Sequence, residues 1–146
     1  MVNDVAEPCY ADIVFVVDES GSVGTDNFDE IKSFLSMFVG TLPIDSGHAR
    51  VGVVTFSGTV NTAQAFNMDA HSTVADVQAA IAALTYKAGA TRTDLALAYV
   101  RTTMLTAGAG DRSTHPNVVI VMTDAKSNQA DPTAVSIMRK FTKKLT

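Results

Sequence analysis

The sequence predicts an α/β fold with an open, doubly wound and mostly parallel sheet that carries helices on both faces. Runs of consecutive apolar residues, such as IVFVV at 13–17 and VVIVM at 118–122, are typical of strands buried on both faces. The segments between these runs repeat their apolar residues at the spacing of a helix. Strands that alternate with helices in this way indicate a parallel sheet.

Length and charge restrict the possible classes of protein. The 146 residues contain no repeat, low-complexity tract or linker, so we expect residues 1–146 to form a single domain. A net charge of −4 without any basic block argues against a nucleic-acid partner. No apolar run is long enough to span a membrane.

The first predicted strand, within residues 11–18, leads into a helix that we expect Thr25 or Asp26 to cap. Gly40 and Pro43 mark the end of this helix. Its apolar stripe consists of Phe28, Ile31, Leu35 and Phe38.

A second buried strand is predicted at residues 50–56, which read RVGVVTF. Ser57 and Gly58 then turn the chain into residues 59–66, where polar and apolar residues mix. This mixture predicts an antiparallel edge strand that is joined to the second strand by a hairpin.

The middle of the chain predicts two more helices. Thr73 is expected to open a helix whose apolar residues continue to Leu84. After a loop at 87–93, residues 94–105 predict a helix with little polar surface, which we expect to lie against the sheet with Thr93 as its cap.

Two of the buried strands are predicted to end in an acid. Asp18 ends the first strand, and Asp124 ends the strand predicted at 117–124, before a helix that begins at Asp131-Pro132. In an open parallel sheet, ligands bind at the carboxyl ends of the strands, where the strand order reverses. If the two strands are neighbours, both carboxylates point into one crevice.

Hydroxyl groups are predicted beside these two acids. Ser20 and Ser22 follow Asp18 at alternate positions, and Thr91 lies in a loop expected on the same rim. An oxygen-only set of ligands suits Mg²⁺ or Mn²⁺ better than zinc, because nothing here offers sulfur or imidazole. The alternative is a helix N-terminus rich in capping residues, with the acid favoured by the helix dipole. It would explain Asp18, Ser20 and Ser22 but not Thr91 and Asp124.

With these residues in place, the chain resembles a von Willebrand factor A domain of the extracellular-matrix type, the module shared by integrin I domains, matrilins and collagen VI-type proteins. The metal-ion-dependent adhesion site of that family has the pattern Asp-x-Ser-x-Ser, then a threonine, then an aspartate after a buried strand. The resemblance implies a site for Mg²⁺, Mn²⁺ or Ca²⁺. The matching positions, in family order, are Asp18, Ser20, Ser22, Thr91 and Asp124.

The resemblance implies a secreted protein-binding module of the extracellular matrix. Its cation would bind an exposed Asp or Glu of a matrix or cell-surface partner, such as collagen. The alternative is a scaffold for matrix assembly or mineral that does not use the metal for adhesion. We do not expect an enzyme, because no histidine lies in the predicted rim loops, and His48, His71 and His115 are expected to be solvated surface residues.

Some features depart from the family pattern. A complete A domain continues with further strands and a helix, so we expect a C-terminally truncated fold in which residues 118–123 form an exposed edge open to self-association. Cys9 alone fits a free thiol or half of a disulfide, and the resemblance implies a disulfide partner outside this sequence. Glu19 is expected to add charge near the rim, and Ala125 stands where the family commonly has glycine.

Overall fold

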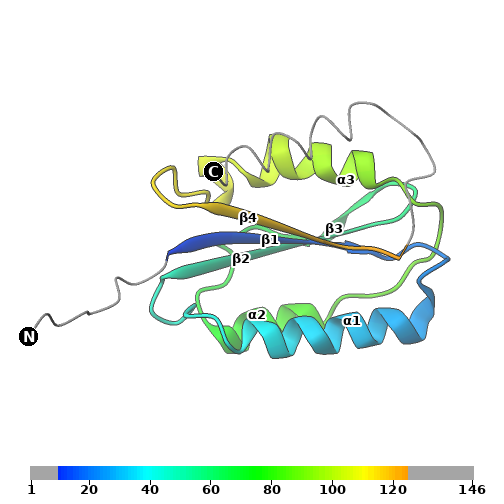
Figure 1. Ribbon diagram of the computed structural model, residues 1–146, viewed down its shortest axis with the longest axis horizontal. Coiled ribbons are helices and arrows are strands. Elements are labelled where there is room, and N and C mark those ends of the chain that lie inside the picture. Colours follow the sequence, from blue (N-terminus) through cyan, green and yellow to red (C-terminus); the bar gives the residue numbers. More distant parts are fainter. Residues whose placement is uncertain (1–9, 125–146) are drawn as a thin grey trace, which may run out of the picture.

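The computed structural model describes residues 10–124, which form a four-stranded sheet with helices on both faces (Figure 1). This arrangement confirms the predicted α/β class. The predictions for Cys9, for Ala125 and for a helix that begins at Asp131-Pro132 lie outside the described residues.

The sheet has the strand order β3-β2-β1-β4. β1 (Ala11–Asp18) lies between β2 (Ala49–Phe56) and β4 (Asn117–Met122), and it pairs in parallel with both. β3 (Val60–Phe66) pairs antiparallel with β2 at the edge, as the mixed polarity of its sequence predicts. From β1 the chain continues to β2 on one side, and it later returns to β4 on the other side. The strand order therefore reverses between β1 and β4.

The register brings the carboxyl ends of the three parallel strands to one edge. Val17 of β1 is opposite Thr55 of β2 on one side and Met122 of β4 on the other. Asp18 and the residues that follow Met122 therefore emerge side by side.

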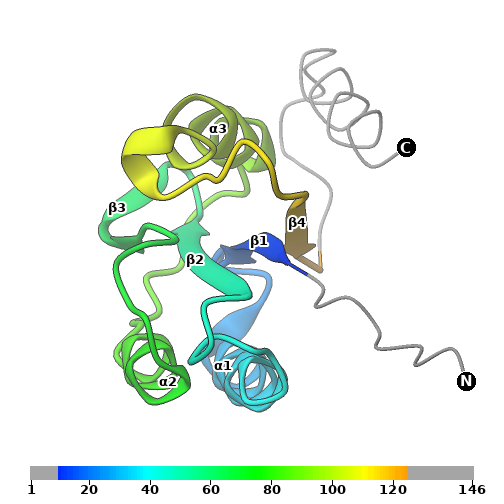
Figure 2. The same cartoon turned by 90° about the vertical axis from the view of Figure 1, so that its left-hand side faces the viewer.

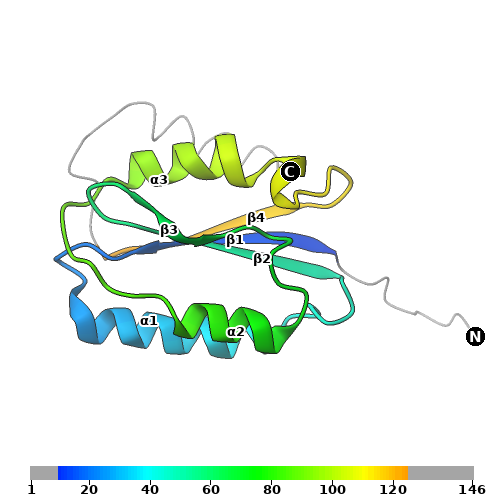
Figure 3. The ribbon, with the colours of Figure 1, turned by 180° about the vertical axis from the view of Figure 1, so that it is seen from behind.

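The helices cover the sheet in two layers. α1 (Gly24–Val39) and α2 (Val74–Ala82) lie beside each other on one face, and α3 (Thr93–Tyr99) lies on the other (Figures 2 and 3). α3 continues into a π-helical turn (Val100–Met104) and is followed by a short 3₁₀ helix (Ala107–Ala109). The predicted helix at 94–105 is therefore present, with a change of helical geometry at Val100.

Residues of β1 alternate between two apolar cores. Phe15 and Val17 are fully buried in the core formed with α1 and α2, while Val14 and Val16 are buried in the core formed with α3. A run of consecutive apolar residues is thus required on this strand, because neither face contacts water. The same reasoning explains the apolar run in β2.

One of the three predicted helix caps is present. The hydroxyl oxygen of Thr73 accepts a hydrogen bond of 3.1 Å from the backbone amide of Asp76 at the start of α2. The prediction for Thr25 or Asp26 is wrong: Gly24, with a φ of +75°, allows α1 to begin before them, and its N-cap position is Val23. Thr93 is likewise the first residue of α3 instead of its cap, and its buried hydroxyl oxygen has no hydrogen-bond partner among residues 10–124.

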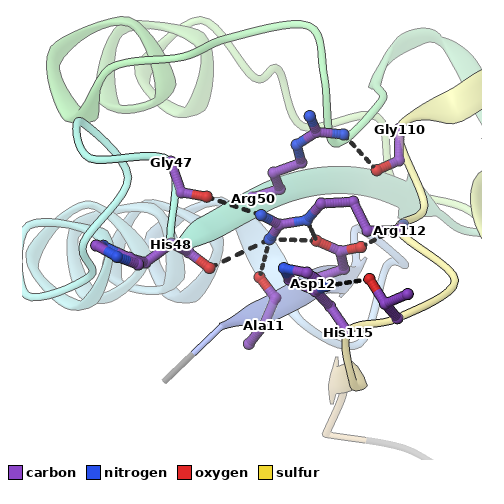
Figure 4. A network of polar contacts seen from close by, with 9 residues as sticks. Ala11, Asp12, Gly47, His48, Arg50, Gly110, Arg112 and His115 are labelled. Atoms are coloured by element: carbon purple, nitrogen blue, oxygen red, sulfur yellow. Dashed lines mark hydrogen bonds and ion pairs between the residues drawn. The ribbon is translucent and has the colours of Figure 1, made fainter. Parts of the chain in front are cut away.

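A buried ion pair lies at the amino-terminal ends of the parallel strands, opposite to the carboxyl ends (Figure 4). Asp12, fully buried in β1, accepts hydrogen bonds from the Nε and the backbone amide of Arg112 at 2.7 and 2.6 Å. The guanidinium group of Arg112 also donates to the carbonyl oxygens of Ala11, Gly47 and His48. One arginine therefore connects three segments of the chain.

The three histidines are partly exposed, and each also packs against an aromatic ring. The rings of His48 and His115 each lie 4.7 Å from the ring of Tyr10, and the ring of His71 lies 5.1 Å from that of Phe66. They pack on neighbouring aromatic rings, a contact that their scattered positions in the sequence do not reveal.

β4 is an outer strand of the described sheet, and all six of its residues are partly buried. Self-association through residues 118–123 stays a prediction. Within residues 10–124, no helix is both long and apolar enough to cross a membrane.

Candidate metal centre

The carboxylate of Asp18 lies at the carboxyl end of β1, fully buried and bonded on both oxygens. The backbone amide of Ser20 donates to its Oδ1 at 2.8 Å, and the hydroxyl of Thr123 donates to its Oδ2 at 2.6 Å. Thr123 follows β4, so this second bond joins the ends of two neighbouring strands. The carboxylate is thereby held in one orientation.

Two serine hydroxyls extend this arrangement to the second acid. The Oγ atoms of Ser20 and Ser22 are 3.1 Å apart, and the hydroxyl of Ser22 donates to Oδ1 of Asp124 at 3.1 Å. Ser20 is fully buried, whereas Ser22 and Asp124 are exposed. Four of the five predicted site residues therefore form one hydrogen-bonded series that runs from the core to the surface.

The fifth predicted residue, Thr91, lies in a loop that packs against the same turn. The hydroxyl of Tyr86 donates to the carbonyl oxygen of Ser20 at 3.1 Å, and the amide of Gly21 donates to the carbonyl oxygen of Gly89 at 2.9 Å. Thr91 follows two residues later, with 5% of its surface exposed. The loop between α2 and α3 is thus attached to the Asp18–Ser22 turn at two points.

Gly89 also contacts the hairpin between β2 and β3. It has a φ of +124°, and a Cβ atom at this position would lie 3.1 Å from Oγ of Ser57. The amide of Arg92 donates to the carbonyl oxygen of Ser57 at 2.8 Å. A glycine is required at position 89 for the loop to approach the hairpin in this conformation.

Glu19 does not lie on the rim, and that expectation is wrong. It is 1% exposed, and burial raises the pKa of its carboxyl group. Hydrogen bonds from Asn61, Thr55 and Gln64 and the attraction of Lys87 act in the opposite direction. The sequence offers no direct signal for this burial, because the polar partners come from β2, β3 and the loop after α2 and share no motif with Glu19.

A second ion pair stabilises the start of α3. Nε and Nη2 of Arg92 donate to the two carboxylate oxygens of Asp94 at 2.8 and 2.7 Å. The hydrogen bonds from Arg92 hold the pKa of Asp94 below its ordinary value, and burial opposes this shift. Arg92 directly follows Thr91, so the ion pair fixes the end of the loop that carries Thr91.

The available ligands suit a hard cation. Within residues 10–124, no three His, Cys, Asp or Glu side chains gather into one cluster that could hold a metal. A cation at the Asp18–Asp124 edge would therefore depend on serine and threonine hydroxyls in addition to two carboxylates. Mg²⁺, Mn²⁺ and Ca²⁺ accept oxygen ligands of this kind.

Comparison with known proteins identifies the family. The model of the von Willebrand factor type A domain matches residues 12–142, so the chain belongs to this family. It is 36% identical to the human collagen alpha-1(XX) chain over 132 residues, which cover 90% of this chain and 10% of the collagen. It is 36% identical to human matrilin-1 over 116 residues, which cover 80% of this chain and 23% of matrilin-1.

A solved structure shares the fold. Proximal thread matrix protein 1 from the mussel byssus, with a zinc-occupied metal-ion-dependent adhesion site, superposes with a TM-score of 0.79 at 26% identity. The match covers 90% of this chain and 36% of that one. The chain thus spans well under half the length of each relative, and all three are collagens, matrilins or matrix proteins by name.

Proposed function

We propose that the chain is a cation-dependent protein-binding module of the extracellular matrix. The observation that most supports this function is the hydrogen-bonded series from Asp18 through Ser20 and Ser22 to Asp124. Membership of the von Willebrand factor A family and the matrix proteins among its relatives support the extracellular location.

Each site residue has a separate role in this proposal. The hydroxyls of Ser20, Ser22 and Thr91 bind the cation directly, while Asp18 and Asp124 act largely through water. With few direct anionic ligands, the cation would retain positive charge and attract the carboxylate of an Asp or Glu on the partner. The surrounding loops, including the hairpin after β2, then select the partner by shape and charge.

The choice of cation is part of the proposal. Oxygen ligands favour Mg²⁺ or Mn²⁺ over zinc in the absence of sulfur and imidazole. Zinc nevertheless occupies the corresponding motif of the mussel protein, so zinc must be compared directly. We expect calorimetric titration to detect binding of Mg²⁺ and Mn²⁺ to the wild-type chain and none to Asp18→Ala.

Binding to a partner is tested with immobilised matrix proteins, beginning with collagen. We expect binding in Mg²⁺ that is lost in EDTA and in Asp18→Ala, because the cation forms the bridge to the partner. A ligand that stays bound after chelation contradicts the bridge and favours a scaffold that does not use the metal for adhesion. Ser20→Ala and Ser22→Ala should each weaken binding of the cation.

A further inference from the structure

The buried carboxylate of Glu19 lies next to the candidate metal centre but is not one of its five proposed ligands. Glu19 stands between Asp18 and Ser20, and its backbone amide donates to the carbonyl oxygen of Phe56 at the end of β2 at 2.8 Å. With only 1% of its surface exposed, it cannot contact a partner directly. Its side chain instead contacts β3.

Both carboxylate oxygens of Glu19 accept hydrogen bonds from β3. Nδ2 of Asn61 donates to Oε1 at 3.1 Å, and Nε2 of Gln64 donates to Oε2 at 2.9 Å. Nζ of Lys87 lies 3.5 Å from Oδ1 of Asn61. Two neutral amides and one nearby cation therefore surround a single buried acid.

Gln64 carries this network to the loop between α2 and α3. Its Oε1 accepts from the amide of Thr85 at 2.9 Å, and its Nε2 donates to the carbonyl oxygen of Thr85 at 3.1 Å. Thr85 immediately precedes Tyr86, whose hydroxyl bonds the backbone of Ser20. The contacts thus form a closed path from the metal-site turn through β3 to the loop that carries Thr91.

We propose that Glu19 is a positioning residue, which holds the hydroxyls of Ser20 and Ser22 in place for the cation through its bonds to β3. This inference rests on the proposed function, because it assumes that the cation binds at this turn. Replacing a side chain that orients metal ligands through hydrogen bonds commonly lowers the affinity for the metal.

The cost of burial supports a role toward a cation. A buried carboxylate loses the solvation of bulk water, and an apolar side chain of similar size would fill the space without that cost. Asn61 and Gln64 offset part of this cost, and a divalent cation bound beside the same turn would offset more through its charge. The carboxylate and the cation would therefore stabilise each other.

The test is a titration of Mg²⁺ and Mn²⁺ by calorimetry, combined with the melting temperature in EDTA. Glu19→Gln keeps the size of the side chain but replaces one acceptor oxygen with an NH2 donor that faces an amide donor of β3, and we expect the Kd for the cation to rise about tenfold. Gln64→Leu leaves the charge of Glu19 intact and removes one support, so the Kd should rise in the same direction. If Glu19→Gln does not fold, the Kd of Gln64→Leu provides the test.

Asp12→Asn provides the matched control, because Asp12 is a fully buried carboxylate at the other end of β1. It should lower the melting temperature and leave the Kd for the cation unchanged. If Glu19→Gln or Gln64→Leu lowers the melting temperature but leaves the Kd unchanged, the network serves only to stabilise the fold and the inference is wrong. A wild-type chain that binds neither cation instead overturns the proposed function itself.

Discussion

The carboxylate of Asp94 titrates in a setting that makes stability depend on pH. It is 5% exposed and bonded by both arms of the Arg92 guanidinium group, which lowers its pKa in the folded chain. The unfolded chain therefore binds the proton more tightly. The ion pair contributes its full stability above the ordinary pKa of an aspartate, and this contribution disappears as the pH falls through the lower pKa of the folded state.

Asp94→Asn should lower the free energy of unfolding by about 2 kcal/mol at neutral pH, because bonds to a charged group are lost. At about pH 3 the difference between the variant and the wild type should be smaller, since the unfolded wild-type chain is then stabilised by binding a proton at Asp94. Urea denaturation at both pH values measures the two differences. A difference that grows toward acid pH would contradict the role of the ion pair.

Single residues differ in how far the sequence predicts them. Asp18 and Asp124 could be identified as neighbours in space because each follows a buried run, and ends of parallel strands meet at one edge. The burial of Glu19 could not be predicted, because it depends on the register that brings Asn61 opposite Thr55. Such a register is a property of strand pairing and is not encoded in any local pattern.

Among the elements, the short 3₁₀ helix (Ala107–Ala109) ends at a glycine that admits no side chain. Gly110 has a φ of +90°, and a Cβ atom there would lie 2.7 Å from both Cβ and the backbone nitrogen of Asp69. Gly110→Ala should lower the free energy of unfolding by about 2–4 kcal/mol, because left-handed backbone strain and overpacking combine.

Gly108 offers a matched control in the same 3₁₀ helix, because a Cβ atom at its position would contact nothing within 4 Å. Gly108→Ala should change the free energy of unfolding by no more than about 0.5 kcal/mol. Chemical denaturation of both variants provides the comparison. Equal losses would show that the contact with Asp69 does not limit this turn.

The elements themselves were largely predictable, and their ends were not. β1, β2 and β4 are revealed by apolar runs because both faces of the sheet are covered. Capping preferences place the start of α1 too late, since Gly24 permits a backbone conformation that lets the helix begin two or three residues earlier. Local capping preferences give way where a glycine or a neighbouring turn determines the backbone.

Across the whole molecule, the ion pair between Asp12 and Arg112 anchors the edge opposite the candidate metal centre. Arg112→Met leaves the buried Asp12 without its counter-ion, so the free energy of unfolding should fall by about 3–5 kcal/mol. Arg101→Met, at an exposed position of the π-helical turn, serves as the control and should change stability little. Thermal and urea unfolding measure both effects.

Cation affinity gives a second readout of the same pair of variants. Because Arg112 and the Asp18–Asp124 edge lie at opposite ends of β1, a folded Arg112→Met chain should bind Mg²⁺ like the wild type. A loss of cation binding in this variant would mean that the two edges are coupled through the sheet. The two ends of the strands would then not act separately in stability and in binding.

The proposed function requires one cation bound beside the hydroxyls of Ser20, Ser22 and Thr91. The most direct measurement is a crystal structure in saturating Mn²⁺, with anomalous scattering recorded to locate the metal. We predict a single strong anomalous peak within bonding distance of these three hydroxyl oxygens, with Asp18 and Asp124 around it. The absence of a peak at this edge, or a peak only elsewhere on the chain, would contradict the claim.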